Sequence, residues 1–313
     1  MKFSGLESRI KVNGILLLDK PQGMSSNHAL QRVKRLYGAA KAGHTGSLDP
    51  LATGLLPICF GHATKVSGLL LEADKHYEVT GRLGIRTNTG DAEGEVIESR
   101  PVPALSEADI ETVLAGFRGE YNQVPPMYSA IKINGQRLYK LARKGKEVER
   151  PPRRVILHEI RLLSLEADSF SLYVHCSKGT YIRTLVEDIG QAIGCGASVT
   201  QLRRVGLGPW LRPQMHSLEA LYALADAAGE DNEARKNALN HVILPTDSAL
   251  VDYPAVMLDE ESTFHIRHGH PVFVPKAPQD GWFRLYGPDN LFLGIGEVLD
   301  DGRVAPRRLI AAL

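Results

Sequence analysis

The most informative stretch of this chain is Gly43-His44-Thr45-Gly46-Ser47-Leu48-Asp49-Pro50-Leu51-Ala52-Thr53-Gly54-Leu55-Leu56. Its residue types predict an ordered loop: glycines permit left-handed backbone and close approach by a ligand, and Pro50 restricts the backbone directly after Asp49. A carboxylate held in this way can act as a nucleophile or a general base. The same Asp can instead form an Asx turn or cap. The residues alone leave both interpretations open.

Strands and helices are predicted on both sides of this loop. Before it, a buried strand over residues 14–19 leads into a helix that is capped near Ser25-Ser26-Asn27 and ends at Gly38. After it come a strand over 55–60 and an alternating, half-buried strand over 75–85.

Further elements follow without a regular strand–helix–strand alternation. They are a helix capped by Ser106, a tight turn at Asn134-Gly135, strands over 155–165 and 169–177, a helix over 181–193 and a helical stretch over 217–243. This mixture predicts an α+β domain built around a mixed or antiparallel sheet. We place its end near Pro245-Thr246-Asp247, because the rest of the chain shows short strands, including 283–286 and 292–298, and Gly-rich turns.

Length and composition agree with a folded protein of roughly two domains: 313 residues, 43% of them hydrophobic. Apolar stretches such as 14–18 are too short to cross a bilayer, and residues 1–7 lack a signal-peptide core, so we expect a cytoplasmic protein without membrane contact. The three cysteines form no Cys-x-x-Cys pair, which favours reduced, buried thiols over a disulfide framework or a zinc site.

The formal net charge of +1 conceals two basic segments. Residues 1–48 carry eight Lys and Arg against two acids, and residues 131–160 carry nine against three. The balancing acids lie elsewhere, notably in 91–98 and around 219–233. Such segregation lets one face meet phosphates while another repels them. Either basic segment alone is more typical of a solvated helix face than of a nucleic-acid-binding surface.

Several motifs in order resemble the TruB family of tRNA pseudouridine synthases. They are the Asp49 loop with Lys20-Pro21-x-Gly23-x-Ser25-Ser26 before it, Lys75-x-Tyr77, Pro125-Pro126-x-Tyr128-Ser129-Ala130-Ile131-Lys132-x-x-Gly135, Cys176-Ser177-x-Gly179-Thr180-Tyr181-Ile182-Arg183 and Thr200-Gln201-Leu202-Arg203-Arg204. The resemblance runs from about Gly14 to at least Gly206. A single Gly-rich loop would be weak evidence, whereas ordered motifs over this length are strong.

The resemblance implies a pseudouridine synthase fold, α+β with a central mixed, largely antiparallel sheet flanked by helices. Residues 1–250 would form the catalytic domain, with an RNA-clasping thumb insertion at about 124–154. Residues 251–313 resemble the small β-rich PUA-like RNA-binding domain that bacterial members carry.

The activity implied by the family is isomerisation of uridine 55 in the TΨC loop of tRNA to pseudouridine, with no metal, redox carrier or other cofactor. Asp49 would be the essential carboxylate, acting either on the ribose C1′ or by elimination of the 2′ hydrogen through a glycal. Sequence leaves these two routes open. Because the target base is hidden in a folded loop, the enzyme would flip it out.

Other site residues are carried over from the same motifs. Arg183 would hold the Asp49 carboxylate charged and oriented, since a carboxylate in a closed pocket needs a cationic neighbour. Tyr77 would stack on the base and take part in proton transfer, with Tyr181 and Leu202 lining the uracil site. His44 would fill the vacated stack, and Lys20 would support the pocket wall or contact phosphate. Taken without the motifs, these residues are equally typical of core or surface positions.

The basic segment that follows the Ser-Ala-Ile-Lys motif would contact the RNA backbone. Its candidates for phosphate contact are Lys132, Arg137, Lys140, Arg143 and Lys144. The implied partner is the T stem-loop of tRNA, and we expect a monomer that needs no protein partner.

Three other classes compete with this interpretation. The main alternative is a non-catalytic RNA-binding protein or tRNA-folding chaperone, which needs the basic segments but not Asp49. A nucleoside hydrolase would share the glycosidic-bond chemistry but release free uracil. A guide-RNA-dependent relative similar to dyskerin is disfavoured by the lack of a lysine-rich tail.

Overall fold

The computed structural model of the protein describes residues 12–133 and 135–310. Lys2, Arg9 and Lys11 of the first basic segment lie outside the described residues, as does Asn134 of the predicted turn.

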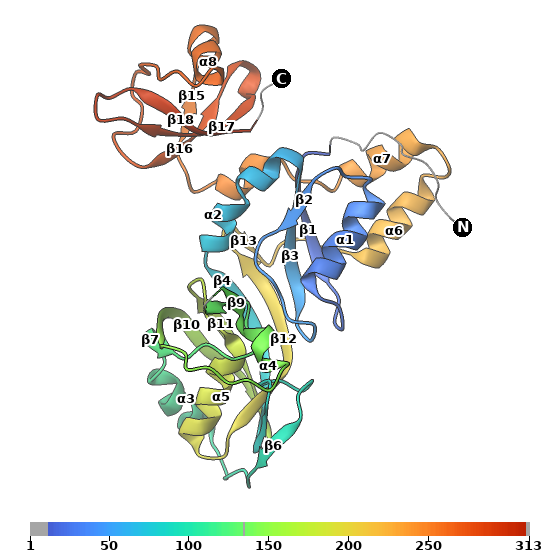
Figure 1. Ribbon diagram of the computed structural model, residues 1–313, viewed down its shortest axis with the longest axis vertical. Helices are drawn as coiled ribbons and strands as arrows, with labels where there is room; N and C mark the ends of the chain where they lie inside the picture. Colours follow the sequence, from blue (N-terminus) through green and yellow to red (C-terminus); the bar gives the residue numbers. More distant parts are fainter. Residues whose placement is uncertain (1–11, 134, 311–313) are drawn as a thin grey trace.

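One large sheet organises the molecule, and it is mixed and largely antiparallel, as predicted. Its strands are β1 (Gly14–Lys20), β2 (Ala42–His44), β3 (Thr53–Phe60), β4 (Lys75–Leu83), β7 (Gly119–Gln123), β10 (Arg153–Leu165), β11 (Ser169–Cys176), β12 (Ala197–Leu207), β13 (Trp210–Leu211) and β14 (His216–Ser217). They run in the order β14-β1-β3-β12-β4-β11-β10-β7, with β2 beside β3 and β13 beside β12 (Figure 1). Only the β1–β14 and β3–β12 pairs are parallel among these described strands.

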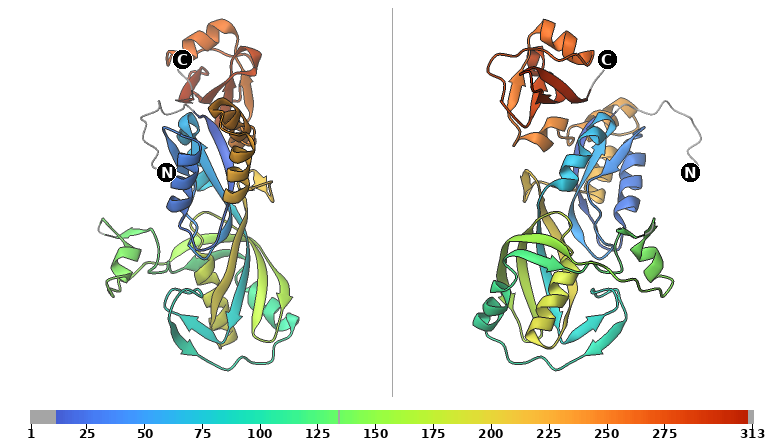
Figure 2. Two further views of the ribbon diagram at one scale, coloured as in Figure 1. Left: turned by 90° about the vertical axis from the view of Figure 1, so that its right-hand side faces the viewer. Right: turned by 60° about the vertical axis from the view of Figure 1, so that its left-hand side comes forward.

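Seven α-helices are described before the C-terminal sheet: α1 (Ser26–Leu36), α2 (Ser67–Glu72), α3 (Glu107–Ala115), α4 (Leu138–Ala142), α5 (Ile182–Ile193), α6 (Leu218–Ala227) and α7 (Asn232–Asn240). Five of them flank the large sheet in two groups. Figures 1 and 2 show α1, α6 and α7 beside β1 and β3, and α3 and α5 beside the β4–β12 half. The two groups therefore cover different halves of the sheet, and the Asp49 loop comes from the half that carries β1 and β3.

Local sequence signals explain where several helices begin. The Ser25 Oγ accepts a hydrogen bond from the His28 backbone at 3.2 Å at the start of α1. At α3, Ser106 and Asp109 form a reciprocal capping box. These predicted starts are confirmed.

Two predicted elements are shorter than expected. The helical stretch over 217–243 is two helices, because α6 ends before Gly229, which has a φ of +76°, and Asp231 caps α7. The strand predicted over 75–85 ends at Leu83, because Gly84 has a φ of +76°. A new strand, β5 (Ile85–Thr87), then pairs with β6 (Val96–Ser99).

A second sheet lies at the C-terminal end (Figure 1). It contains, in spatial order, β15 (Ala255–Met257), β16 (Trp282–Tyr286), β17 (Phe292–Val298) and β18 (Val304–Leu309). The predicted strands 283–286 and 292–298 are among them, whereas α8 (Glu260–Arg267) was not predicted. This sheet has its own apolar core, and Arg308 and Lys65 form hydrogen bonds that link it to the rest of the protein.

The interior is apolar on both sides of β1, β3 and β12. Cys59, Cys176 and Cys195 are buried free thiols, as expected. Among residues 12–133 and 135–310, no helix is both long and apolar enough to cross a membrane.

Candidate functional site

The Asp49 loop connects β2 to β3 and is held on both sides of Asp49. The buried Ser26 hydroxyl accepts from the Leu48 backbone N–H at 2.7 Å and donates to the Leu48 carbonyl at 3.0 Å. On the other side, the Gly23 N–H donates to the Pro50 carbonyl at 2.8 Å. The Lys20–Ser26 motif therefore fixes the backbone on either side of the carboxylate, which explains why the two motifs occur together.

Lys20 takes part in the same support. Its ammonium is fully buried and donates to the carbonyls of Pro21, Met24 and Pro50 at 2.8, 2.6 and 3.4 Å. Burial lowers its pKa to about 8, an effect that the nearby Asp49 carboxylate opposes. Of the two roles considered for Lys20, this geometry fits support of the pocket wall, because the nitrogen is not exposed for phosphate contact.

Arg204, to which the sequence motifs assign no role, ties the start of the loop to the sheet. Its buried guanidinium donates to the Leu55 carbonyl at 2.7 Å and to the Gly46 carbonyl at 3.2 Å. At the other end of the loop, Gly54 has a φ of +96°, and a Cβ there would lie 2.3 Å from the Arg204 carbonyl oxygen. Strand β12 thus packs against both ends of the loop.

Asp49 and Arg183 meet in the structure. The Arg183 Nε lies 2.9 Å from the Asp49 Oδ2; the side chain of Arg183 is 6% exposed and that of Asp49 is 43% exposed. The remaining guanidinium nitrogens donate to the carbonyls of Thr89 and Tyr128 at 2.6 and 2.8 Å. Arg183 is thereby fixed from several sides. The Asp49 side chain is more exposed to solvent than we expected for a carboxylate in a closed pocket.

A second carboxylate lies at Arg183, and the sequence patterns do not reveal it. The Asp91 Oδ2 lies 3.6 Å from the Arg183 Nη1, and Asp91 is buried. The charge pattern groups Asp91 with the acids that balance the basic segments, and it does not reveal this contact. Asp91 is drawn inward because the Ala92 N–H and the Gly90 carbonyl bond to Val199 on β12. The one sequence signal for the burial of Asp91 is that this acid lies in a Gly-rich turn.

The aromatic and apolar candidates come from three strands of the large sheet. Tyr77 and Leu202 are buried side chains of the central core, from β4 and β12. Burial raises the pKa of the Tyr77 hydroxyl, and Arg204 opposes this effect. His44 lies on β2, and burial lowers its pKa, with Arg204 adding to the shift. The His44 Nδ1 is buried and has no hydrogen-bond partner among the described residues.

Tyr181 stands at the start of α5, two residues before Arg183. Its backbone N–H donates to the Gln123 Oε1 at 2.7 Å, and its carbonyl accepts from the Gln123 Nε2 at 3.0 Å. Gln123 is buried at the end of β7 and was also missed from sequence. Burial raises the pKa of the Tyr181 hydroxyl. This clamp positions the start of α5, and with it Arg183.

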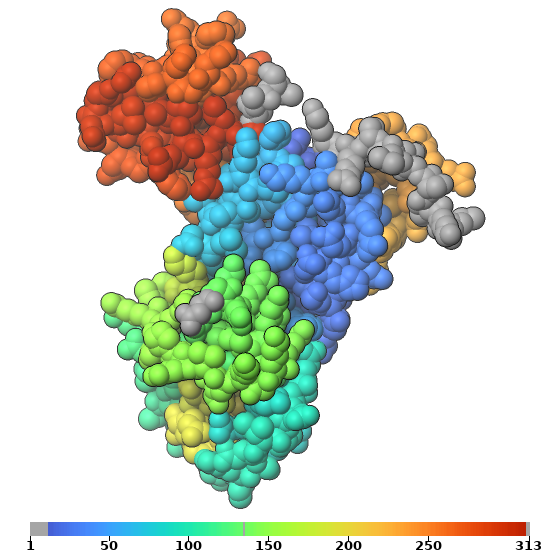
Figure 3. Space-filling view, viewed as in Figure 1, coloured from blue at the N-terminus to red at the C-terminus, as the bar shows by residue number. Residues whose placement is uncertain are grey.

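The predicted thumb insertion projects from the rest of the molecule (Figure 2). It carries β8 (Lys132–Ile133), β9 (Gln136–Arg137) and α4. Figure 3 shows it in yellow-green, next to the blue N-terminal region. Its five candidate cations are exposed, and none of them has a carboxylate within 4.0 Å among the described residues: Lys132, Arg137, Lys140, Arg143 and Lys144.

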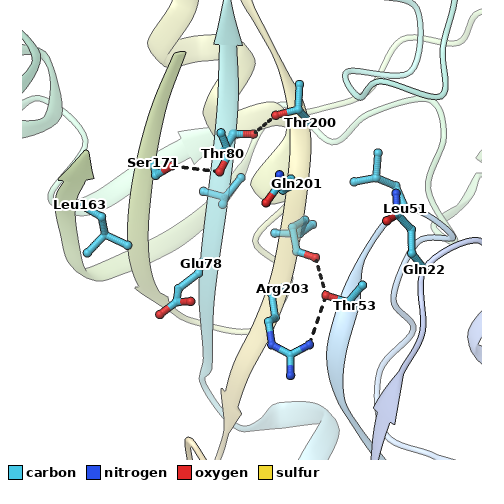
Figure 4. A pocket seen from close by; sticks show the side chains of 12 residues that line it. Gln22, Leu51, Thr53, Glu78, Thr80, Leu163, Ser171, Thr200, Gln201 and Arg203 are labelled. Carbon is cyan, nitrogen blue, oxygen red and sulfur yellow. Dashed lines mark hydrogen bonds between the residues drawn. The ribbon is translucent and has the colours of Figure 1, made fainter. Parts of the chain in front are cut away.

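A hollow of about 510 Å³ adjoins the loop (Figure 4). Polar side chains of β4, β11 and β12 line it, and Leu51 and Leu202 border it. Neither Asp49 nor Arg183 is among its lining residues. The candidate site therefore rests on the Asp49–Arg183 pair and not on this hollow. A group of His and Asp side chains with metal-ligand spacing lies elsewhere, at Asp74, His158 and His175.

Comparison with known families matches nearly the whole chain. The TruB family pseudouridylate synthase N-terminal domain matches residues 34–182. The tRNA pseudouridylate synthase B C-terminal domain matches 183–251, and the pseudouridine synthase II TruB C-terminal family matches 254–310.

Solved structures of other proteins share the fold of this chain. A Cbf5-Nop10-Gar1 complex matches with a TM-score of 0.72 and 24% identity, covering 96% of this chain and 87% of that one. An archaeal box H/ACA Nop10-Cbf5 complex matches with a TM-score of 0.71 and 21% identity, covering 99% and 89%. At these identities the likeness concerns the fold alone.

Curated relatives are far closer in sequence. The tRNA pseudouridine synthase B of Nitrosococcus oceani is 56% identical over 299 residues, covering 96% of this chain and 95% of the relative. Those of Coxiella burnetii and Pseudomonas aeruginosa are 53% and 54% identical, covering 96% of this chain and 95% and 97% of the relatives. Because these matches extend over almost the full length, the chain belongs to the TruB family of pseudouridine synthases.

Proposed function

We propose that this protein converts uridine 55 in the TΨC loop of tRNA to pseudouridine, with Asp49 as the catalytic carboxylate. The observation that carries the proposal is the ion pair between the Asp49 Oδ2 and the Arg183 Nε at 2.9 Å, on a loop braced on both sides of the Asp. The names of the curated relatives support a tRNA substrate. With such a substrate, we expect the enzyme to act in the cytoplasm as a monomer.

The reaction breaks the C1′–N1 bond, turns the uracil and forms a C1′–C5 bond; a proton leaves C5 and one is gained at N1. Asp49 acts on the ribose, by attack at C1′ or by removal of the 2′ hydrogen. Arg183 orients the carboxylate, and because its other nitrogens bond to backbone carbonyls, it does so with little freedom to move. This preorganisation is the main contribution that the protein makes before RNA arrives.

Binding of the flipped base uses the groups around Asp49. The exposed side of Asp49 is where the ribose enters. Leu202 supplies an apolar wall, and Tyr77 and Tyr181 supply rings for stacking; burial raises the pKa of both hydroxyls, so both stay protonated at neutral pH. His44 occupies the place of the base in the RNA stack, and Lys20 supports the wall. The flipping cost of a few kcal/mol is offset by these contacts.

Affinity for the RNA comes from the thumb at about 124–154, within a catalytic domain of residues 1–250. Its exposed cations contact the phosphates of the T stem-loop, which fixes register without reading sequence. Residues 251–313, which contain the C-terminal sheet β15–β18, are a PUA-like RNA-binding domain. One apolar cluster lies wholly within it, which supports treating it as a separate unit.

Single-turnover conversion of a transcribed tRNA tests the proposal. The parent protein should form pseudouridine at position 55, and Asp49→Asn should form none while binding the tRNA with near-parent affinity. A tRNA with cytidine at position 55 is the matched substrate control and should yield no pseudouridine. Tight binding by the parent with all uridine unchanged would instead favour the RNA-chaperone alternative, and free uracil would favour a hydrolase.

A further inference from the structure

A cluster of histidines lies on the face of the large sheet that is opposite to Tyr77. His76 follows Lys75 on β4 and precedes Tyr77, so its side chain points to the other face. His175 on β11 pairs directly with His76, and the two rings stack with centroids 4.0 Å apart. The His158 ring, from β10, lies 4.6 Å from the His175 ring. Three neighbouring strands thus bring three imidazoles together.

A β-bulge explains how His158 joins this group. The register between β10 and β11 shifts between Leu157 and Glu159, so that His158 is the additional residue. Regular alternation would turn His158 and Glu159 to opposite faces, but both are exposed while Leu157 and Ile160 are buried. Bulges re-aim side chains in this way, often beside functional sites.

Asp74 completes the cluster from the residue just before β4. Its Oδ2 lies 3.1 Å from the His158 Nε2 and 3.7 Å from the His175 Nε2. The three ligand atoms all lie within 4.8 Å of one another. In a tetrahedral zinc site with bonds of about 2.0–2.1 Å, two ligand atoms are roughly 3.3 Å apart. The two distances to Asp74 lie on either side of that value.

The surroundings favour imidazoles that act as ligands. The His76 Nδ1 is 2.7 Å from the Tyr173 hydroxyl, which holds the His76 ring against His175. Glu159 on the same face is engaged by the Arg161 Nε at 3.0 Å. In a tetrahedral site, a water molecule would then fill the fourth coordination position.

We propose that Asp74, His158 and His175 bind one Zn²⁺ ion at this face of the sheet. Two imidazoles and a carboxylate suit a borderline divalent ion such as Zn²⁺ and are unsuited to Mg²⁺ or Ca²⁺, which prefer all-oxygen sites. Each imidazole coordinates through its Nε2 and keeps its proton on Nδ1. The ion links β10 and β11 to the start of β4, the strand that carries Tyr77 on its other face. It acts as a structural link, and it takes no part in the proposed isomerisation.

Zinc titration of the chelator-treated full-length protein tests this site. The parent should bind one Zn²⁺ by calorimetry, and the bound ion should raise the Tm. His158→Gln and Asp74→Asn should each weaken binding by roughly tenfold or more, since loss of a ligand should cost at least as much as loss of an outer partner. Co²⁺ offers an independent readout: the parent complex should show the intense visible absorption of a four-coordinate site, and His158→Gln should lose it.

His268→Gln is the matched control, because His265, His268 and His270 form a separate histidine group in the C-terminal sheet region. It should leave zinc binding and the Tm shift unchanged. Thermal unfolding without metal shows whether each variant is folded. If only one of the two cluster variants folds, that variant alone is enough to test the site. The proposal is overturned if the parent binds no Zn²⁺, if folded cluster variants bind it as the parent does, or if His268→Gln removes the binding.

Discussion

Arg183 reaches Asp49 from inside the protein, with its Nε 2.9 Å from the Asp49 Oδ2, while the other side of the carboxylate stays open to solvent. The guanidinium also lies 3.6 Å from Asp91, so it stands between two carboxylates. The catalytic candidate is thus fixed by a buried partner before any substrate binds. Arg183, which orients the carboxylate, therefore lies on the inner side of Asp49, and the side proposed to receive the RNA is the exposed one.

Replacing Arg183 by Lys should therefore lower the rate of pseudouridine formation far more than the affinity for tRNA. A lysine keeps the charge but cannot bond to Asp49 and to the carbonyls of Thr89 and Tyr128 in the fixed planar geometry of a guanidinium. A displacement of about 1 Å in a reacting group can lower the reaction rate about 100-fold, so we expect the single-turnover rate to fall at least that much. Filter binding should show a change in Kd of only a few-fold.

Arg86→Lys is the control for this substitution. Arg86 is a partly buried arginine that pairs with two carboxylates, those of Glu98 and Glu187, and not with Asp49. Its variant should retain most of the rate. The orienting role of Arg183 would be contradicted if both variants lost the rate to a similar extent. It would also be contradicted if weaker tRNA binding accounted for the lower rate of Arg183→Lys.

Gly54→Ala should damage the loop through its backbone. The φ of +96° is strained for alanine, and the new Cβ would lie 2.3 Å from the Arg204 carbonyl oxygen, so β12 or the loop must move. We expect a loss of roughly 3 kcal/mol or more in the free energy of unfolding. Gly229 has a φ of +76°, but a Cβ there would meet nothing within 4 Å, so Gly229→Ala should cost only about 1 kcal/mol. Equal costs in urea unfolding would show that crowding at Gly54 is unimportant.

Sequence patterns predicted the elements around the site better than the contacts within it. The strand over 14–19, the Ser25 cap and the Asp49 loop follow from local residue types, which is why they could be located. Asp91 and Gln123 could not, because each is buried by pairing with a segment about 60 residues or more away along the chain. The histidine cluster depends on a bulge in β10, and a shift of register leaves no mark in single-sequence periodicity.

Removing two thumb cations should change the salt dependence of tRNA binding. Arg143 and Lys144 are both exposed, so replacing them together by Ala should leave the fold and the chemical step nearly unchanged. Each lost phosphate contact makes the slope of log K against log salt shallower by about 0.9 on a duplex. We therefore expect weaker binding and a slope shallower by about 1–2. Lys236→Ala, on α7, is the control with a parent-like slope; equal slopes for parent and the double variant would refute backbone contact.

Lys20 should make the stability of the protein depend on pH in the alkaline range. Its pKa is about 8 in the folded protein against an ordinary value of 10.5, so between these values the unfolded chain binds more protons than the folded one. Stability therefore rises with pH in this window, as the cost of a buried charge is relieved. Relative to Lys20→Met, whose residue does not titrate, the parent should gain ~1 kcal/mol per pH unit above pH ~8 in the free energy of unfolding. A difference that stays flat would mean that Lys20 keeps an ordinary pKa despite its burial, and a change in the opposite direction would mean that its pKa is raised in the folded protein.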